Sequence, residues 1–255
     1  FSEILFMKKN KTRIYTERRL APGETIEISS AKFHHIARVL RVREGDTISF
    51  FNALDGEFLA KVISLKKKSC DARIVKKIRT SESRNDIWIL FAPIKKIRLD
   101  FLIEKVTELG VSGIYPIFTK NTVVQSVSHK RMSNYAVSAS EQTARLSVPE
   151  IFPPARLKAV INSWPRDRHL LVCDETGSGG SIIKTLSMKA FNNVSRWAIL
   201  IGPEGGFEKT EINFLSNQKF VTLVSLGPRL LRADTAAIAA LSCWQSVRGD
   251  WIGRN

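Results

Sequence analysis

Three glycine-containing segments, each following an apolar run typical of a strand, are the first candidates for chemistry in this sequence. They cover residues 174–180, 202–207 and 227–232. In open α/β sheets, ligands bind beyond the carboxyl ends of the strands, and glycine lets the backbone come close to a ligand. We therefore predict that these segments form the walls of a ligand site. The alternative is that they are only tight turns, because Gly-Pro pairs also mark turns.

Several familiar catalytic arrangements are missing from the sequence. Residues 202–207 do not match the G-x-G-x-x-G pattern of dinucleotide-binding folds, and no phosphate loop with its lysine occurs. His34 and His35 lack cysteine or acidic partners at metal-binding spacing, so we predict no metal site. No Ser/His/Asp or Cys/His combination stands out, which leaves hydrolytic chemistry without support.

The chain is strongly basic, with 40 Lys and Arg against 24 Asp and Glu among 255 residues and a formal net charge of +16. Residues 1–80 hold 18 Lys and Arg against 9 Asp and Glu, a net charge of +9. Residues 81–255 hold the other 22 against 15, a net charge of +7 over a much longer stretch. A dense positive excess attracts polyanions, which favours a nucleic-acid partner over a basic surface that is merely solvated.

The elements that must position the glycine segments fall into two groups. Residues 1–80 contain short strand-like runs, turn signals and one helix that begins near Ser30, which together predict a small β-barrel. Beyond a polar link, apolar runs alternate with helical periodicity, which predicts an α/β domain with a mainly parallel sheet over residues 81–255. Because Met7 follows them, residues 1–6 are expected to be an extension of the first domain.

Membrane and disulfide-rich classes do not fit this composition. No apolar run approaches the roughly 18 residues that a membrane-spanning helix needs. The three cysteines, Cys70, Cys173 and Cys243, are far apart and odd in number, which argues against a disulfide framework or a zinc site. We therefore expect the protein to work in the reducing cytoplasm.

Five blocks of sequence, in order along nearly the whole chain, resemble one family of enzymes. They are FHHIARVLR at 33–41, EKVTELGV at 104–111, EQTAR at 141–145, LIGPEGGF at 200–207 and LGPRLLRADTA at 226–236. Together they resemble the SPOUT class of RNA methyltransferases. More narrowly, they are similar to the RsmE family, the 16S ribosomal RNA uridine-N3 methyltransferases.

This resemblance implies a fold, a cofactor and an oligomeric state. The fold would be α/β, a SPOUT-type trefoil-knotted, mainly parallel sheet with an N-terminal PUA-like β-barrel that binds RNA; such knots are rare exceptions among folds. The cofactor would be S-adenosylmethionine without a metal, and the active site would draw on both subunits of a homodimer. By position, the cofactor-binding residues would be Leu200, Gly202, Pro203, Glu204, Gly205, Gly206, Leu226, Gly227, Leu231 and Arg232.

The sequence departs from the family's pattern in two places. Asp234 stands where the family usually has Glu, which shortens the side chain by one methylene. Residues 119–122 read Thr-Lys-Asn-Thr where the family usually has a block that contains arginine. A lysine supplies the positive charge of an arginine but not its planar, two-pronged donor group.

Methylation of uracil at N3 requires that nitrogen to lose its proton, and the charge then spreads onto the two flanking carbonyl oxygens. Arg232 is the candidate to stabilise this charge, because a planar guanidinium suits a delocalised anion. Asp234 and Glu204 are the candidates to accept the proton or to orient Arg232. Asp234 also has the sequence context of an N-cap for the last helix, so both interpretations of this residue stay open.

Basic side chains of the first domain, together with one from the EQTAR block, are the candidate RNA contacts. They are Arg13, Lys32, His34, Arg38, Arg41, Arg43 and Arg145. We predict S-adenosylmethionine-dependent methylation of a uridine N3 in the 16S ribosomal RNA of the small subunit. Two alternatives stay open, a SPOUT-class ribose 2′-O methyltransferase and a non-catalytic RNA-binding factor for ribosome assembly.

Overall fold

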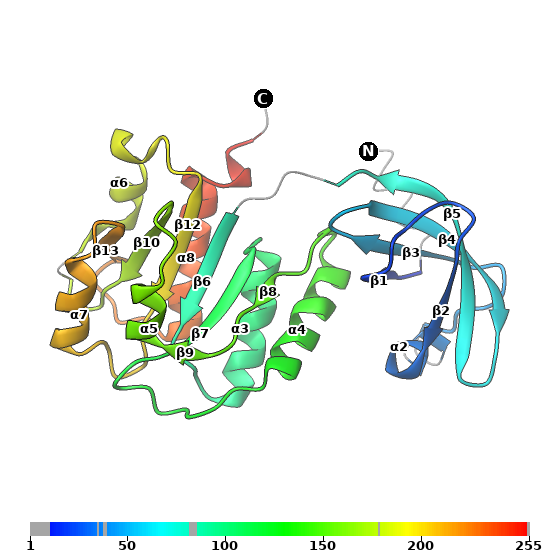
Figure 1. Cartoon of the computed structure of the whole chain (residues 1–255), viewed down its shortest axis with the longest axis horizontal. Helices are drawn as coiled ribbons and strands as arrows, with labels where there is room; N and C mark the ends of the chain where they lie inside the picture. The colour runs from blue at the N-terminus through cyan, green and yellow to red at the C-terminus, as the bar shows by residue number, and fades with distance from the viewer. Residues whose placement is uncertain (1–10, 35, 38–39, 82–85, 178, 254–255) are drawn as a thin grey trace. The chain divides into compact units, whose positions relative to one another are not determined.

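The computed structural model describes most of the chain, and Figure 1 shows its helices and strands. The described residues are 11–34, 36–37, 40–81, 86–177 and 179–253. The chain forms two compact units, one of residues 1–83 with 140–148 and one of residues 84–139 with 149–255. The expected extension at residues 1–6 and the candidate RNA contact Arg38 lie outside the described residues.

The first unit is built on a curled five-stranded sheet with the order β1-β3-β4-β5-β2. Strand β1 runs parallel to β3, and the other neighbours are antiparallel. A short helix, α2 (Ser30–His34), follows the second strand. The strands are β1 (Arg13–Tyr15), β2 (Thr25–Ser29), β3 (Thr47–Asn52), β4 (Gly56–Leu65) and β5 (Ser69–Arg79).

The hairpin between β3 and β4 shows how the sequence dictates this sheet. Asn52 accepts hydrogen bonds from the backbone N–H groups of Leu54 and Asp55 through its Oδ1, which shapes the turn. Gly56 follows with φ +94°, and a Cβ at this position would lie 2.2 Å from the carbonyl oxygen of Arg79. Inward-facing side chains of all five strands then form one apolar core, including Ile14, Ile26, Phe50, Ala60, Val62 and Ile74.

Arg13 attaches the segment 140–148 to this sheet. Its Nε donates to Glu57 Oε1 at 3.0 Å, and its Nη1 and Nη2 donate to the carbonyl oxygens of Ser140 and Arg145 at 3.0 and 2.6 Å. The residue is 8% exposed, and its guanidinium also lies over the Phe51 ring. Arg13 was a candidate phosphate contact, but the structure gives its donors to the protein itself, so we assign it a structural role.

The second unit is a parallel sheet with the order β11-β13-β10-β12-β6-β7-β8, to which β9 adds beside β7. Its central strands are buried on both faces, as their continuous apolar sequences predict. The shortest strands, β8, β9 and β11, have two residues each and were not expected from periodicity. The strands are β6 (Asp86–Phe91), β7 (Gly113–Phe118), β8 (Glu150–Ile151), β9 (Ala155–Arg156), β10 (Arg168–Cys173), β11 (Gly180–Ser181), β12 (Arg196–Ile201) and β13 (Val221–Ser225).

Helices cover this sheet from both faces. Leu157 of α5 and Leu215 of α7 pack against one face, where they meet Leu170 and Leu200. Helix α8 packs against α3, α6 and β12. The helices are α3 (Lys96–Glu108), α4 (His129–Gln142), α5 (Leu157–Asn162), α6 (Ile182–Leu186), α7 (Lys209–Ser216) and α8 (Ala233–Val247), with short 3₁₀ turns η2 (Lys189–Phe191) and η3 (Asp250–Ile252). None of the helices in the described ranges combines the length and apolar character that crossing a bilayer requires.

An ion pair between a buried arginine and a half-buried aspartate fastens the amino-terminal ends of three neighbouring strands. Arg168 at the start of β10 is 3% exposed, and its Nη2 donates to both carboxylate oxygens of Asp86 on β6 at 2.8 Å. Its Nη1 donates to the carbonyl oxygen of Trp197 on β12 at 2.8 Å. Burial lowers the pKa of Arg168, and the Asp86 carboxylate acts in the opposite direction.

Removing the carboxylate of this pair should destabilise the parallel sheet. Asp86→Ala leaves the Arg168 guanidinium buried beside an apolar group, so we expect a loss of about 3 kcal/mol in the free energy of unfolding. All five tryptophans lie between residues 88 and 251, so tryptophan fluorescence in a urea titration reports on this unit. The control is Asp167→Ala, which removes an exposed partner of Arg196 and should cost about 0.5 kcal/mol. Equal losses for the two variants would contradict the assignment.

Candidate functional site

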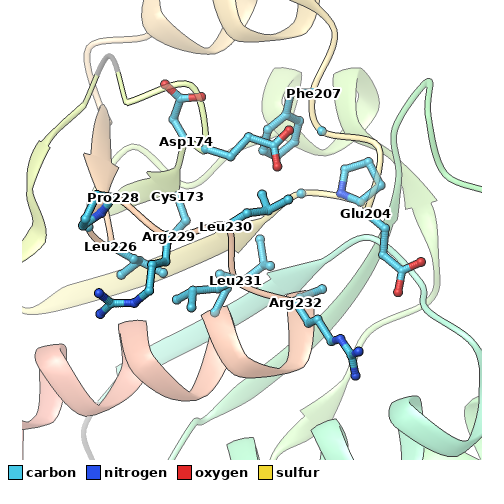
Figure 2. Close-up of a pocket in the computed structure, with 18 of the residues that line it drawn as sticks. Cys173, Asp174, Glu204, Phe207, Leu226, Pro228, Arg229, Leu230, Leu231 and Arg232 are labelled. Carbon is cyan, nitrogen blue, oxygen red and sulfur yellow. The ribbon is translucent and has the colours of Figure 1, made fainter.

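Three loops meet at the carboxyl end of the parallel sheet and enclose one cavity (Figure 2). Strand β10 lies between β12 and β13, with Cys173 in register with Ile201 on one side and Val224 on the other. The loops that follow these strands therefore start side by side. Their residues line a cavity of about 550 Å³, together with Arg98 of α3 and the first residues of α8.

Glycines give the second loop its close packing. A Cβ at Gly202 would lie 2.7 Å from the ring of Phe207, which also lines the cavity. Gly206 has φ +69°, and a Cβ there would lie 1.9 Å from Oε1 of Glu175. Gly202 therefore excludes a side chain by contact with the Phe207 ring, and Gly206 disfavours one through its backbone conformation, since the Glu175 carboxylate could move aside.

The third loop leads from β13 into α8. Gly227 has φ +107° and donates its N–H to Ser225 Oγ at 3.2 Å. Leu231 and Arg232 then reach the start of α8, where the carbonyl oxygen of Arg232 accepts the first helical hydrogen bond, from Ala236 at 2.7 Å. In the view of Figure 2, Arg232 and Glu204 lie at one end of the cavity and Arg229 lies at the other.

The structure brings eight of the ten candidate cofactor residues to this cavity. They are Gly202, Pro203, Glu204, Gly206, Leu226, Gly227, Leu231 and Arg232. Leu200 does not line it, because this residue is fully buried between the sheet and its covering helices. Gly205 does not line it either, and its carbonyl oxygen accepts a hydrogen bond from Asn121 at 3.2 Å.

Several residues that line the cavity were missed in the sequence. Asp174 and Glu175 belong to a loop that the sequence marked as a ligand wall, so their loop was found but not their roles. Arg98 lies on α3, and its Nη1 donates to Glu204 Oε1 at 2.8 Å across 106 residues of sequence. No local pattern announces that contact, because it depends on how α3 packs beside the sheet.

The charged groups at the cavity differ in how firmly they are held. Asp174 is buried, and its two oxygens accept hydrogen bonds from the backbone and hydroxyl of Thr176 at 3.1 and 2.6 Å. Arg232 is exposed, and Glu204 is held by Arg98 at the cavity margin. Burial raises the pKa of Cys173 to about 12, so this thiol stays protonated at neutral pH and is a poor nucleophile.

Asp234 has a different position from the one its sequence context indicated. Helix α8 begins at Ala233, so the N-cap is Arg232, and the N-cap interpretation of Asp234 is wrong. Asp234 instead lies in the first turn, where its Oδ1 accepts the N–H of Thr235 at 3.0 Å and its charge favours the positive end of the helix dipole. It is absent from the lining of the cavity, whereas Glu204 is part of that lining.

The candidate RNA contacts of the first unit lie in different surroundings. His34, Arg41 and Arg43 are exposed, and Arg41 has an unusual φ of +50°. Lys32 is exposed but donates to Glu141 Oε1 at 3.1 Å. Arg145 is half-buried and donates its Nε to the carbonyl oxygen of Ser147 at 3.1 Å. Among the described residues, no group of three or more His, Cys, Asp and Glu side chains is arranged to hold a metal ion.

Two family models match the chain. Residues 81–245 match an RNA methyltransferase domain, and residues 28–75 match an RNA methyltransferase PUA domain. Among curated proteins, ribosomal RNA small subunit methyltransferase E of Rickettsia conorii is 32% identical over 237 residues, which cover 92% of this chain and 95% of that protein. The protein of the same name from Buchnera aphidicola subsp. Acyrthosiphon pisum is 30% identical, and the match covers 98% of this chain and 99% of that protein.

Solved structures agree with these matches. The crystal structure of ribosomal RNA small subunit methyltransferase E from Neisseria gonorrhoeae, bound to S-adenosyl methionine, has a TM-score of 0.80 at 25% identity and covers 92% of this chain and 97% of its own. A methyltransferase from Legionella pneumophila in complex with bound SAM has a TM-score of 0.80 at 30% identity, with 92% and 96% covered.

The matches confirm the fold class predicted from the sequence, a SPOUT-type, mainly parallel sheet with an N-terminal PUA-like domain, whose sheet forms a curled half-barrel; the trefoil knot stays a prediction. They also confirm the resemblance on which that prediction rested, because the matched blocks extend over nearly the whole chain. The chain belongs to the RNA methyltransferase family that includes ribosomal RNA small subunit methyltransferase E.

Proposed function

We propose that this chain transfers the methyl group of S-adenosylmethionine to N3 of a uridine in the 16S ribosomal RNA of the small subunit. The observation that carries the proposal is the convergence of the three loops on a cavity of about 550 Å³. Relatives that carry the name ribosomal RNA small subunit methyltransferase E support it, as does the solved relative that binds S-adenosyl methionine.

The residues at the cavity fit this cofactor. A volume of about 550 Å³ lies within the range of ligand pockets, roughly 300–1,000 Å³. Gly202 and Gly206 leave room for the side chains that pack against the loop, and Leu226 and Leu231 supply aliphatic surface. We assign these four residues, with Pro203 and Gly227, to holding the cofactor. When bound, the cofactor supplies a sulfonium methyl group that a nitrogen nucleophile can accept.

The chain's own side chains would move the proton and stabilise the charge. The uracil N3 proton must leave before the nitrogen can attack, and Glu204 at the cavity margin is the group we assign to accept it. Arg98 is a positioning residue in this scheme, because it holds the Glu204 carboxylate at 2.8 Å. Arg232, exposed at the same end of the cavity, would face the negative charge that develops on the carbonyl oxygens of uracil.

Asp234 has a supporting role in this proposal. Its carboxylate accepts the N–H of Thr235 and lies in the first turn of α8, two residues after the residue that caps the helix. It therefore stabilises the end of α8 from which Arg232 extends, rather than taking the proton itself. Asp234 stands where the family usually has Glu, and the shorter side chain is compatible with this role, because the hydrogen bond to Thr235 is local and within its reach.

A homodimer is part of the proposal. Ile97 and Phe101 lie one turn apart on α3 and are 88% and 44% exposed, and Leu230 of the third loop is 78% exposed. Arg98 and Leu230 line the cavity, so the apolar side chains lie close to the chemistry. Pairing with a second copy would cover them and let both copies contribute to one active site. The three cysteines are free, which is compatible with the cytoplasm as the place of the reaction.

The first domain, residues 1–80 with its dense positive charge, would hold the RNA. Its exposed candidate contacts include Lys32, His34, Arg41 and Arg43, and Arg145 extends the same unit. These side chains would contact phosphates, which fixes the position of the RNA without reading its sequence. The target base would then enter the cavity of the second unit after leaving its stack, as in other base-modifying enzymes.

Binding of RNA should weaken steeply with salt, whereas binding of S-adenosylmethionine should not. Each phosphate contact contributes about 0.7–0.9 to the slope of log affinity against log salt. Arg41→Gln should therefore lower the magnitude of this slope by about 1 for a 16S ribosomal RNA fragment. The cofactor affinity of the same variant, measured by calorimetry, serves as the internal control. A salt-independent RNA affinity in the wild type would contradict the electrostatic role of the first domain.

Arg232→Ala should slow methyl transfer while the fold and cofactor binding persist. We expect a fall in kcat of roughly 100-fold to 1,000-fold, as when a charge-stabilising donor is removed elsewhere. The assay follows labelled methyl groups from S-adenosylmethionine into small subunits that lack the modification, and nucleoside analysis identifies the product as 3-methyluridine. Arg229→Ala, at the other end of the cavity, is the matched control and should retain most of kcat. Equal rates for wild type and Arg232→Ala would remove Arg232 from the mechanism.

A further inference from the structure

A turn that does not line the cavity is hydrogen-bonded to the loop of residues 202–207, which does line it. The turn, residues 119–122, follows β7 and lies in the same unit as the loop. Asn121 Nδ2 donates to the carbonyl oxygen of Gly205 at 3.2 Å and to that of Gly206 at 3.0 Å. Gly206 lines the cavity and Asn121 does not, so the side chain holds the loop from its outer side.

The turn is itself fixed in place by hydrogen bonds on both sides of Asn121. The backbone N–H of Thr119 donates to Thr122 Oγ1 at 2.9 Å, which closes the turn. The backbone N–H of Lys120 donates to Glu211 Oε1 at 2.9 Å. Glu211 is 8% exposed, and its other oxygen accepts the N–H of Glu208 at 3.1 Å in the capping box of α7. Asn121 therefore has little freedom to leave the carbonyl groups that it contacts.

These contacts determine which way the peptide groups of the loop face. In a trans peptide, the N–H points away from the C=O of the same unit. The carbonyl of Gly206 is turned toward Asn121, so the N–H of Phe207, in the same peptide unit, is directed away from Asn121; Phe207 itself lines the cavity. The N–H of Gly206 donates a hydrogen bond to the carbonyl oxygen of Pro203 at 2.9 Å, which closes a turn within the loop.

We propose that Asn121 is a positioning residue for the cofactor: it holds the carbonyls of Gly205 and Gly206 outward so that the Phe207 N–H faces an acceptor atom of the bound nucleoside. The inference rests on the proposed function, because it takes S-adenosylmethionine as the ligand. An aspartate at this position has nearly the same shape but no donors, and its charge would face two carbonyl oxygens. It should turn the peptide groups of the loop and remove the donor from the cavity.

Calorimetry on the full-length protein compares the S-adenosylmethionine affinity of the wild type with that of three variants. We expect Asn121→Asp to raise Kd at least 10-fold and Asn121→Ala about 3-fold to 10-fold, because the free loop then adopts the binding-competent orientation for only a fraction of the time. The matched control is Lys120→Met, in the same turn, whose Nζ pairs with Glu208 and not with the glycine loop. Its Kd should stay within twofold of the wild type. The two Asn121 variants should melt a few degrees below the wild type and remain folded at the temperature of the titration.

A second readout follows the Phe207 N–H directly. Selective ¹⁵N labelling of the 14 phenylalanines gives a simple amide spectrum, and the Phe207→Leu variant assigns the signal of interest. We expect this signal to shift on addition of S-adenosylmethionine in the wild type and in Lys120→Met. In Asn121→Ala and Asn121→Asp, the same addition should leave it nearly unmoved. A residue with a merely structural role would change the melting temperature without removing this response.

Each outcome bears on a different claim. If the wild type does not bind S-adenosylmethionine, the proposed function fails. If it binds and Asn121→Asp binds equally well, the inference about Asn121 is overturned while the proposed function stands. If Asn121→Asp unfolds, the Phe207 amide signal and the Asn121→Ala variant decide. A wild-type Phe207 signal that does not shift on addition of S-adenosylmethionine overturns the inference. A shift that is present in the wild type and lost in Asn121→Ala supports it.

Discussion

The side-by-side pairing of β13, β10 and β12 is the constraint on which the site depends. Because these strands are parallel neighbours, with Cys173 in register with both Ile201 and Val224, their following loops begin at the same edge of the sheet. Three segments far apart in sequence thus enclose one cavity. The ion pair of Arg168 and Asp86 joins the amino-terminal ends of β10 and β6. The sheet is therefore held at the edge opposite to the one where the loops begin.

Local sequence features predicted much of the fold and the three loops that line the cavity. Buried parallel strands have continuous apolar sequences, and glycines mark close backbone approach, so both are visible without a structure. Leu200 was predicted to line the cofactor site, but its neighbour Ile201 lines the cavity instead. Successive side chains of a strand face opposite ways, so Ile201 reaches the cavity while Leu200 packs beneath the covering helices. For Asp234, the helix starts two residues earlier than an N-cap at this position would require, so the capping position is Arg232.

The contacts that no local pattern reveals all join distant segments. Arg98 meets Glu204 across 106 residues of sequence, and Asn121 meets Gly205 across 84. Arg13 reaches Arg145 across 132 residues, which explains why a residue predicted to contact RNA lies buried instead. Periodicity describes which face of an element is apolar, but it does not say which partner an outward side chain will meet. These positioning contacts therefore required the structure.

We propose that the two units have different roles. The positive charge of the first unit holds the RNA, and the glycine-walled cavity of the second unit holds the methyl donor. The most direct test is nucleoside analysis of 16S ribosomal RNA, by mass spectrometry, from cells with and without the gene for this chain. The account predicts that 3-methyluridine is present in the wild type and disappears from the deletion strain, and that the intact gene restores it. Persistence of 3-methyluridine, or loss of a ribose-methylated nucleoside in its place, would contradict it.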